Sequence, residues 1–144
     1  MANQVANGWK GQLWNGYLAD VYKMILMQPG FVFDPENHAA KADVVASELP
    51  TGNGYTAGGK TLTGIALTID HAEARAELTW DNVQWDAAAG SLAVSGAIIY
   101  NDTAVAGAVY DETDAIVAYI DAGGTITATD GTPIIVSNVM VTTE

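Results

Sequence analysis

The sequence contains no cysteine among its 144 residues, which excludes a disulfide framework, a thiolate metal site and a cysteine nucleophile. It also has no apolar run of the length that spans a bilayer. The N-terminus lacks a basic stretch followed by an apolar core, so we expect no signal peptide. These absences predict a protein that is assembled in the cytoplasm of the cell that makes it.

Basic residues are scarce. Five lysines and arginines oppose 17 acidic residues, and the net charge is -12. Binding to nucleic acid or to an anionic membrane needs the opposite sign, because lysine and arginine must neutralise the phosphates. We therefore expect neither partner. The acidity favours solubility and suppresses stray association; complementarity to a basic partner surface and weak cation binding in the acidic loops remain open alternatives.

The 49% of hydrophobic residues are spread over short segments, as in a folded globular protein. The length favours one domain, which we place at residues 17–144. Residues 1–16 form a separate N-terminal arm with Trp9 and Trp14 among glycines and asparagines. Two indoles in such a segment predict docking, either on a neighbouring subunit or partner protein or back on the arm's own core.

The pattern after Lys60 is that of β-strands. Residues 61–69 and 73–80 alternate polar and apolar side chains, as half-buried strands do, and residues 70–72 suit a hairpin between them. Further strands are expected at 17–27, 96–100, 115–120, 125–129 and 133–142, with a hairpin at Asp130-Gly131. Seven or eight short strands of this kind predict a mainly β protein, an antiparallel β-sandwich of jelly-roll type.

One short helix is expected before this β region. Asp34 is a helix-capping residue, Pro35 suits the first helical position, and Glu36 adds an acid to the first turn. We therefore predict a helix over residues 35–42. Residues 43–49 could add a helical turn, and the glycine-rich segment 51–59 is expected to be a loop.

Chemistry-bearing residues form no catalytic pattern. His38 and His71 lack the i, i+4 spacing of a zinc motif, and no serine lies in a nucleophile elbow. The many carboxylates could approach in pairs by chance, and the aspartates match no calcium-binding loop. We expect no enzyme activity, no cofactor and no metal site.

Residues 54–61 spell Gly-Tyr-Thr-Ala-Gly-Gly-Lys-Thr, which formally matches a phosphate-binding loop. Such a loop needs a hydrophobic strand before it and a helix after it. Here Pro50 precedes the string and a β-type pattern follows it. We interpret the match as accidental.

Four aromatic residues of the β region, Trp80, Trp85, Tyr100 and Tyr119, could form a platform for stacking sugars. Aromatic side chains of a β-sandwich more often belong to its core or to an interface. The sequence alone leaves these alternatives open.

A series of short segments occurs in a fixed order along the chain: Phe31, Phe33, Asp34, Ala42-Asp43-Val44, Ser47-Glu48-Leu49, Gly52-Asn53-Gly54-Tyr55-Thr56, Leu62-Thr63-Gly64, Thr79-Trp80-Asp81, Val83, Trp85, Ala97-Ile98-Ile99-Tyr100 and Tyr119-Ile120-Asp121-Ala122-Gly123-Gly124. In these segments the chain resembles a family of small virion structural proteins of tailed bacteriophages. The resemblance covers residues 17–142 in order, whereas the N-terminal arm does not align.

The resemblance implies a non-enzymatic component of a phage particle. Small size, acidity and the missing catalytic residues favour a capsid decoration (cement) protein, a homotrimer on the outer surface of the shell of major capsid protein. Candidate contact residues are Trp9, Trp14 and Tyr55. The alternative is a tail or head-fibre adhesin with a carbohydrate-binding module, which would expose Trp80, Trp85 or Tyr55 in a row.

Overall fold

The computed structural model describes residues 6, 11, 15–103 and 113–143. Within them it contains nine strands, one short helix and one 3-10 turn. In chain order these are β1 (Tyr22–Met27), α2 (Lys41–Val44), η1 (Val45–Ser47), β2 (Lys60–Thr61), β3 (Ala66–Asp70), β4 (Arg75–Thr79), β5 (Val83–Asp86), β6 (Leu92–Asn101), β7 (Ile116–Ala128), β8 (Pro133–Val136) and β9 (Met140–Thr143). The predicted class is confirmed: the protein is mainly β, with antiparallel pairing. Its jelly-roll form stays a prediction.

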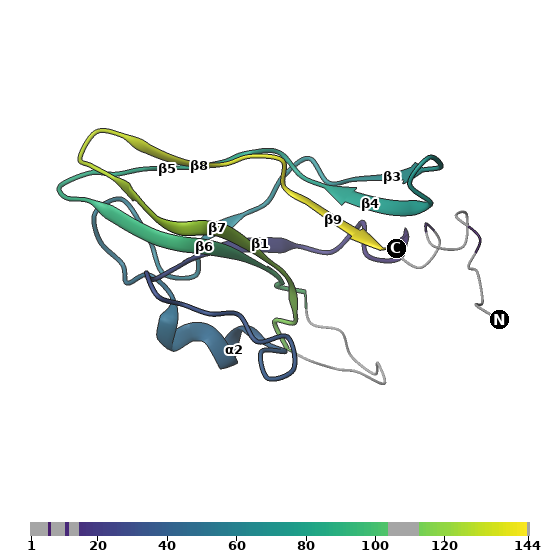
Figure 1. The fold of residues 1–144 in the computed structure, drawn as a ribbon, viewed down its shortest axis with the longest axis horizontal. Coiled ribbons are helices and arrows are strands. Elements are labelled where there is room, and N and C mark those ends of the chain that lie inside the picture. The colour runs from purple at the N-terminus through teal and green to yellow at the C-terminus, as the bar shows by residue number, and fades with distance from the viewer. Residues whose placement is uncertain (1–5, 7–10, 12–14, 104–112, 144) are drawn as a thin grey trace.

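A four-stranded sheet with the order β2-β1-β6-β7 forms the middle of the molecule (Figure 1). Strands β1 and β6 are its two central members and are buried along almost their whole length. Successive side chains of a strand point to opposite faces, so Met24 and Leu26 face one side while Ile25 and Met27 face the other. Burial on both faces explains why these strands are nearly continuous apolar runs.

The second layer is a long two-stranded ribbon that lies above this sheet in Figure 1. One side of the ribbon is β4 followed by β5, and the other is β8 followed by β9. The register is unbroken, because Trp80 N–H donates to the Val139 carbonyl between the two paired stretches. The pairing is interrupted beside Asp81, whose N–H donates instead to the Thr63 carbonyl.

Two predicted strands are wrong in extent, because each is divided in the structure. The segment predicted as one strand at 61–69 is β2 in the four-stranded sheet and then β3 beside β4. It therefore crosses from one layer to the other. The last predicted strand, 133–142, is likewise divided into β8 and β9. Alternation of side chains does not reveal such a crossing, because the pattern is the same in either sheet.

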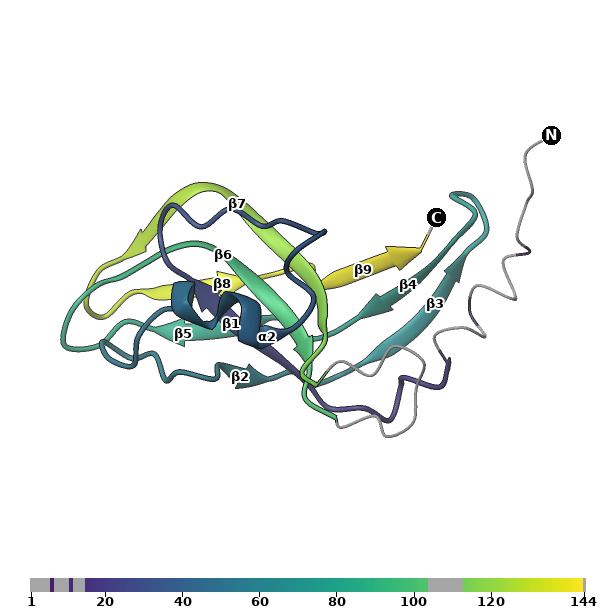
Figure 2. The same cartoon turned by 90° about the horizontal axis from the view of Figure 1, so that it is seen from below.

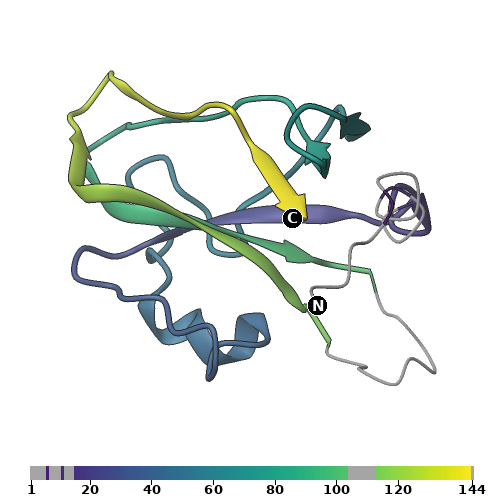
Figure 3. The same ribbon diagram turned by 45° about the vertical axis from the view of Figure 1, so that its right-hand side comes forward.

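Residues 28–49, here called the cover segment, form a third layer over the opposite face of the four-stranded sheet. Figures 2 and 3 show this segment and α2 lying across β1 and β6. Val44, Phe31 and Phe33 pack there against a cluster that includes Ile25 and Ile98. The Gln28 N–H donates to the Ser47 carbonyl and so joins the two ends of the segment. The Leu49 N–H donates to the Leu26 carbonyl of β1, and the Ile116 N–H of β7 donates to the Ala39 carbonyl in the middle of the segment.

The helix predicted at 35–42 is wrong in position. Asp34 does accept a hydrogen bond from the Glu36 N–H, but residues 35–37 form only a turn. The helix begins at Lys41. Its capping carboxylate is that of Asp43, which accepts hydrogen bonds from the N–H groups of Ala39 and Ala40. The further helical turn considered at 43–49 is present in part, as η1.

Strand β7 is bent, and its bend opens one side of the layered structure. Val94 pairs with Ile126 and Gly96 pairs with Asp121. A single residue of β6 therefore lies opposite four residues of β7, 122–125. The strands predicted separately at 115–120 and 125–129 are the two ends of this one bent strand.

Candidate interaction surface

Tyr55, one of the three predicted contact residues, lies inside the protein. Its side chain is 2% exposed. Its hydroxyl donates to Glu48 Oε1 at 2.7 Å and accepts the Leu26 N–H at 3.2 Å. Burial raises the pKa of Tyr55, and the hydrogen bond to Glu48 raises it further. These contacts argue against a direct partner contact by this side chain.

The other two predicted contact residues, Trp9 and Trp14, lie outside the described residues. The neighbouring Gly11 is described and buried. A methyl group at its Cα would lie 2.9 Å from Ile69 Cδ1 of β3. The arm therefore contacts the body of its own chain at this point.

The glycine-rich segment 54–61 does not form a phosphate-binding loop. Strand β2 follows it where a phosphate-binding loop would have a helix. Its Gly58 N–H donates to the carboxylate of Glu48, an anion of the protein itself. Gly59 has φ +72°, and a Cβ there would overlap the Met24 carbonyl oxygen. The glycines thus permit a close approach of the loop to β1.

A row of exposed aromatic side chains for sugar binding is also not found at the predicted positions. Trp80 is 5% exposed and Trp85 is 1% exposed. Trp80 packs edge-on against Tyr22 with ring centroids 5.2 Å apart, and both tryptophans belong to the core between the layers. Tyr100 is buried as well, whereas Tyr119 stacks on Phe33 under the cover segment.

Among the described residues, no group of three histidine or acidic side chains is placed to hold a metal ion. His38 is used by the fold: its Nδ1 accepts the Asp34 N–H at 3.0 Å, and its ring stacks on Phe31. Other aspartates also accept backbone N–H groups of their own chain. Asp70 accepts the Ala72 N–H in its own turn, Asp121 accepts the Gly123 N–H at the bend of β7, and Asp130 accepts the Ala89 N–H of another loop.

The four basic side chains of residues 17–144 make contacts within the chain. Lys23 forms an ion pair with Asp102 at 2.9 Å, and Arg75 pairs with Glu77 at 2.8 Å. Lys41 lies 5.0 Å from the centre of the Tyr100 ring. Lys60 lies over the Trp85 ring and donates to the Gln84 carbonyl. Acidic groups therefore dominate the charge that this part of the chain presents to other molecules.

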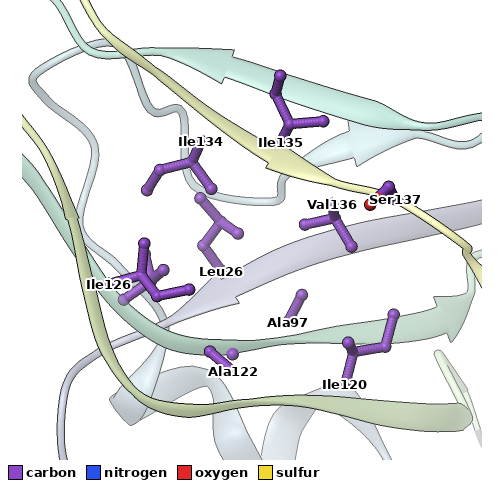
Figure 4. A pocket seen from close by; sticks show the side chains of 11 residues that line it. Leu26, Ala97, Ile120, Ala122, Ile126, Ile134, Ile135, Val136 and Ser137 are labelled. Carbon is purple, nitrogen blue, oxygen red and sulfur yellow. The ribbon is translucent and has the colours of Figure 1, made fainter.

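The best candidate for an interaction surface is an apolar groove between the layers at the bend of β7. We call it the β7/β8 groove; aliphatic side chains line it, including Leu26, Ala97, Ile120, Ile126, Ile134 and Val136. Its volume is about 210 Å³. Figure 4 shows Ile134 and Val136 pointing from β8 toward β6 and β7. The groove can bind apolar groups, but it offers no charged side chain for catalysis.

The edge strands beside the groove add to its capacity to bind a protein. In the part of the chain that the structure describes, β7 is the last strand of its sheet and β8 has β5 as its one partner. Ile126 of β7 is 49% exposed and Ile135 of β8 is 55% exposed. An exposed apolar edge of this kind is a place where a further chain can pair or pack.

Sequence reasoning did not find this groove. Ile126 and Ile134 occur in segments predicted as ordinary strands, and nothing near them in the sequence marks an opening. The glycines at 123 and 124 are the one local signal, because both have the positive φ that allows the bend. No helix among the described residues is long and apolar enough to cross a membrane.

Comparison with known proteins gives no match: no family model, no curated protein and no solved structure is similar to this chain.

Proposed function

We propose that the protein is a non-enzymatic structural protein of a bacteriophage virion, a decoration protein that binds the outer surface of the major capsid protein shell and stabilises it. Two lines of argument support the proposal. The first is the resemblance to small virion proteins over residues 17–142. The second is the kind of surface that the described residues present, which suits binding to another protein.

The observation that carries the proposal is the β7/β8 groove. It combines aliphatic lining with two strand edges, and these are features of protein–protein contacts. The hydrogen-bonding side chains described above hold turns and loops of their own chain. A protein that offers an apolar groove and uses its polar groups internally is suited to assembly.

The charge of the molecule fits the outside of a particle. A net charge of -12 keeps a protein soluble and opposes binding to the nucleic acid inside a capsid. The decoration role thus places the chain on the capsid surface after assembly in the host cytoplasm, with no nucleic acid or membrane as partner.

The adhesin alternative receives less support. A carbohydrate-binding face would expose Trp80, Trp85 or Tyr55, and all three are buried. A trimer suits the decoration role, because local three-fold positions of a capsid multiply weak contacts.

Particles purified from the phage that encodes this chain provide the test. Immunogold electron microscopy should label the head at many positions, and quantitative mass spectrometry should give a copy number comparable to that of the major capsid protein. Heads that lack the chain should release DNA at a lower temperature, and adding the purified protein should reverse this. Label confined to the tail, or absence from the particle, would contradict the proposal.

A further inference from the structure

We propose that the β7/β8 groove binds Trp9 from the N-terminal arm of a second copy of this chain. The inference concerns self-association and does not depend on the phage function. It rests on the size of the groove, the distribution of charge and the place where the arm meets the body.

The groove has the size and chemistry of an indole site. A dry cavity of about 150 Å³ lined by aliphatic and aromatic side chains holds benzene. The β7/β8 groove, at about 210 Å³, is larger by roughly the difference between benzene and indole. Its aliphatic walls match the ring, and its open side lets the indole N–H remain near water. A buried aromatic anchor of this kind dominates many interfaces.

The arm is the one part of the chain whose charge is opposite to that of the body. All 17 acidic residues lie after residue 16, whereas Lys10 is the one charged side chain of residues 1–16. The four basic side chains of the body are engaged within it. An arm with a positive side chain directly after Trp9 is therefore attracted to the acidic body of another copy.

The arm cannot place Trp9 in the groove of its own chain while Gly11 contacts Ile69. Trp9 is two residues from Gly11, a reach of about 7 Å. Ile69 pairs with Ala76, and the groove residue Val136 pairs with Val83. Ala76 and Val83 are seven residues apart on the same side of the ribbon, so the Gly11 contact and the groove are separated by about 23 Å. Figure 1 likewise shows β3 at one end of the molecule and β8 toward the other.

The resulting contact joins different surfaces of the two copies, the β3 end of one and the β7/β8 groove of the next. Such a head-to-tail contact makes a ring when its rotation closes. A ring of three copies would bury three indoles in three grooves, and the unpaired edges of β7 and β8 would remain for a contact with another protein. The arm-in-groove contact therefore provides a physical basis for a trimer.

Engineered cysteines give a direct test, because the chain has none of its own. One preparation carries Gly8→Cys, which keeps the Trp9 indole and Lys10, and a second, with a different tag, carries Ile126→Cys in the groove. Mixed under mild oxidation, they should form a disulfide between copies at least about tenfold faster than a non-docked pair, because docking gives a millimolar effective concentration. The matched control is Val32→Cys, an exposed position on the cover segment.

Two results would overturn the inference. One is a cross-linking rate at Ile126→Cys no higher than that at Val32→Cys. The other is a disulfide within a single chain when one variant carries both Gly8→Cys and Ile126→Cys, which would mean that the arm fills its own groove. Should Ile126→Cys unfold, Ala122→Cys supplies a smaller change in the same groove.

Sedimentation of the cysteine-free chain provides a second measurement. Trp9→Ala should shift the assembly toward monomer by tenfold or more in concentration. Trp14→Ala should not, because position 14 comes in the sequence between Gly11, which contacts Ile69 of its own chain, and the body, and so has less chain with which to reach a second copy. An equal effect of the two substitutions, or no effect of Trp9→Ala, would contradict the assignment of Trp9.

Discussion

At the scale of single residues, Glu48 and Tyr55 make up the most consequential polar pair. Glu48 is a buried carboxylate, and burying a charge is costly unless hydrogen bonds compensate it. The Tyr55 hydroxyl and the Gly58 N–H provide two such bonds. Together they fix the glycine-rich loop against the end of β1.

The substitution Tyr55→Phe tests how much this pair contributes to stability. The substitution keeps the ring and removes the hydroxyl, so Glu48 loses a donor while it remains buried. We expect the free energy of unfolding to fall by about 1–3 kcal/mol, measured by urea denaturation. Tyr17→Phe is the matched control, because Tyr17 is exposed. Equal effects of the two substitutions would contradict a special role for the pair.

Because of two other buried tyrosines, we expect the free energy of unfolding to fall at alkaline pH. Burial raises the pKa of Tyr22 and of Tyr100 from 10.0 to about 12, with a smaller contribution from Asp20 and Asp102 respectively. Below pH 10 the tyrosines are neutral in both states, so their contribution to stability is fully present. Between pH 10 and 12 the unfolded chain ionises first, and stability falls.

Urea denaturation at a series of pH values from about 9 to 12 measures this loss. Absorbance of tyrosinate should rise together with unfolding. Tyr100→Phe should make the dependence on pH weaker. Titration of all tyrosines near pH 10 in the folded protein would contradict the prediction.

At the scale of elements, the short helix α2 acts through a single buried side chain. Val44 is the buried residue of the helix and is 1% exposed, whereas its neighbour Val45 is 52% exposed. A helix of four residues has too few internal hydrogen bonds to be stable alone. Its position is therefore set by packing on the sheet.

Val44→Ala should destabilise the protein by about 1–3 kcal/mol, because it leaves a cavity between the cover segment and the sheet. Val45→Ala, one residue away and exposed, should change stability by no more than about 0.5 kcal/mol. Thermal unfolding followed by circular dichroism measures both. A similar loss in the two variants would mean that the helix does not depend on Val44.

The strand elements are divided at positions where another segment takes over a hydrogen bond. Asp81 N–H pairs with Thr63 rather than with the ribbon, and the Asp81 carboxylate accepts the Thr63 hydroxyl at 3.0 Å. At the β6–β7 pairing, a Cβ on Gly96 would overlap the Ile120 carbonyl oxygen and lie 2.7 Å from the Tyr119 hydroxyl, so the position requires glycine. The groove lies beside this irregular pairing.

At the scale of the whole molecule, charge is distributed unevenly between the arm and the body. The body contains every acidic residue, so its folded form repels itself. Salt screens this repulsion, since the Debye length falls from about 30 Å at 0.01 M to about 8 Å at 0.15 M.

We therefore expect the midpoint of thermal unfolding of the dilute chain to rise by a few degrees between about 0.01 M and 0.15 M sodium chloride. Calcium chloride at the same ionic strength serves as the control, and it should raise the midpoint by the same amount. A larger rise with calcium would reveal a specific cation site, and no rise with either salt would contradict the self-repulsion.

The sequence by itself determined the β class, the central strands and the β3–β4 hairpin. The turn predicted at Asp130-Gly131 is present, but the hairpin is not, because the turn joins β7 to β8 of a different sheet. Alternation of side chains reports which face of a strand is buried, and continuous apolar runs report burial on both faces. The β3–β4 hairpin, the second half of β6 and the two ends of β7 follow from such local signals, whereas the joining of those two ends into one strand does not. The capping chemistry at Asp34 did not place the helix, because turns use the same side-chain hydrogen bonds.

The tertiary structure decided where strands change sheets, why Tyr55 is buried and where the groove opens. Each of these depends on residues distant in the sequence: Thr63 for Asp81, Glu48 and Leu26 for Tyr55, and Leu26 and Ala97 for the wall of the groove. A local pattern fixes the face that must be buried but not the segment that buries it. For that reason the candidate site appears only when the layers are assembled.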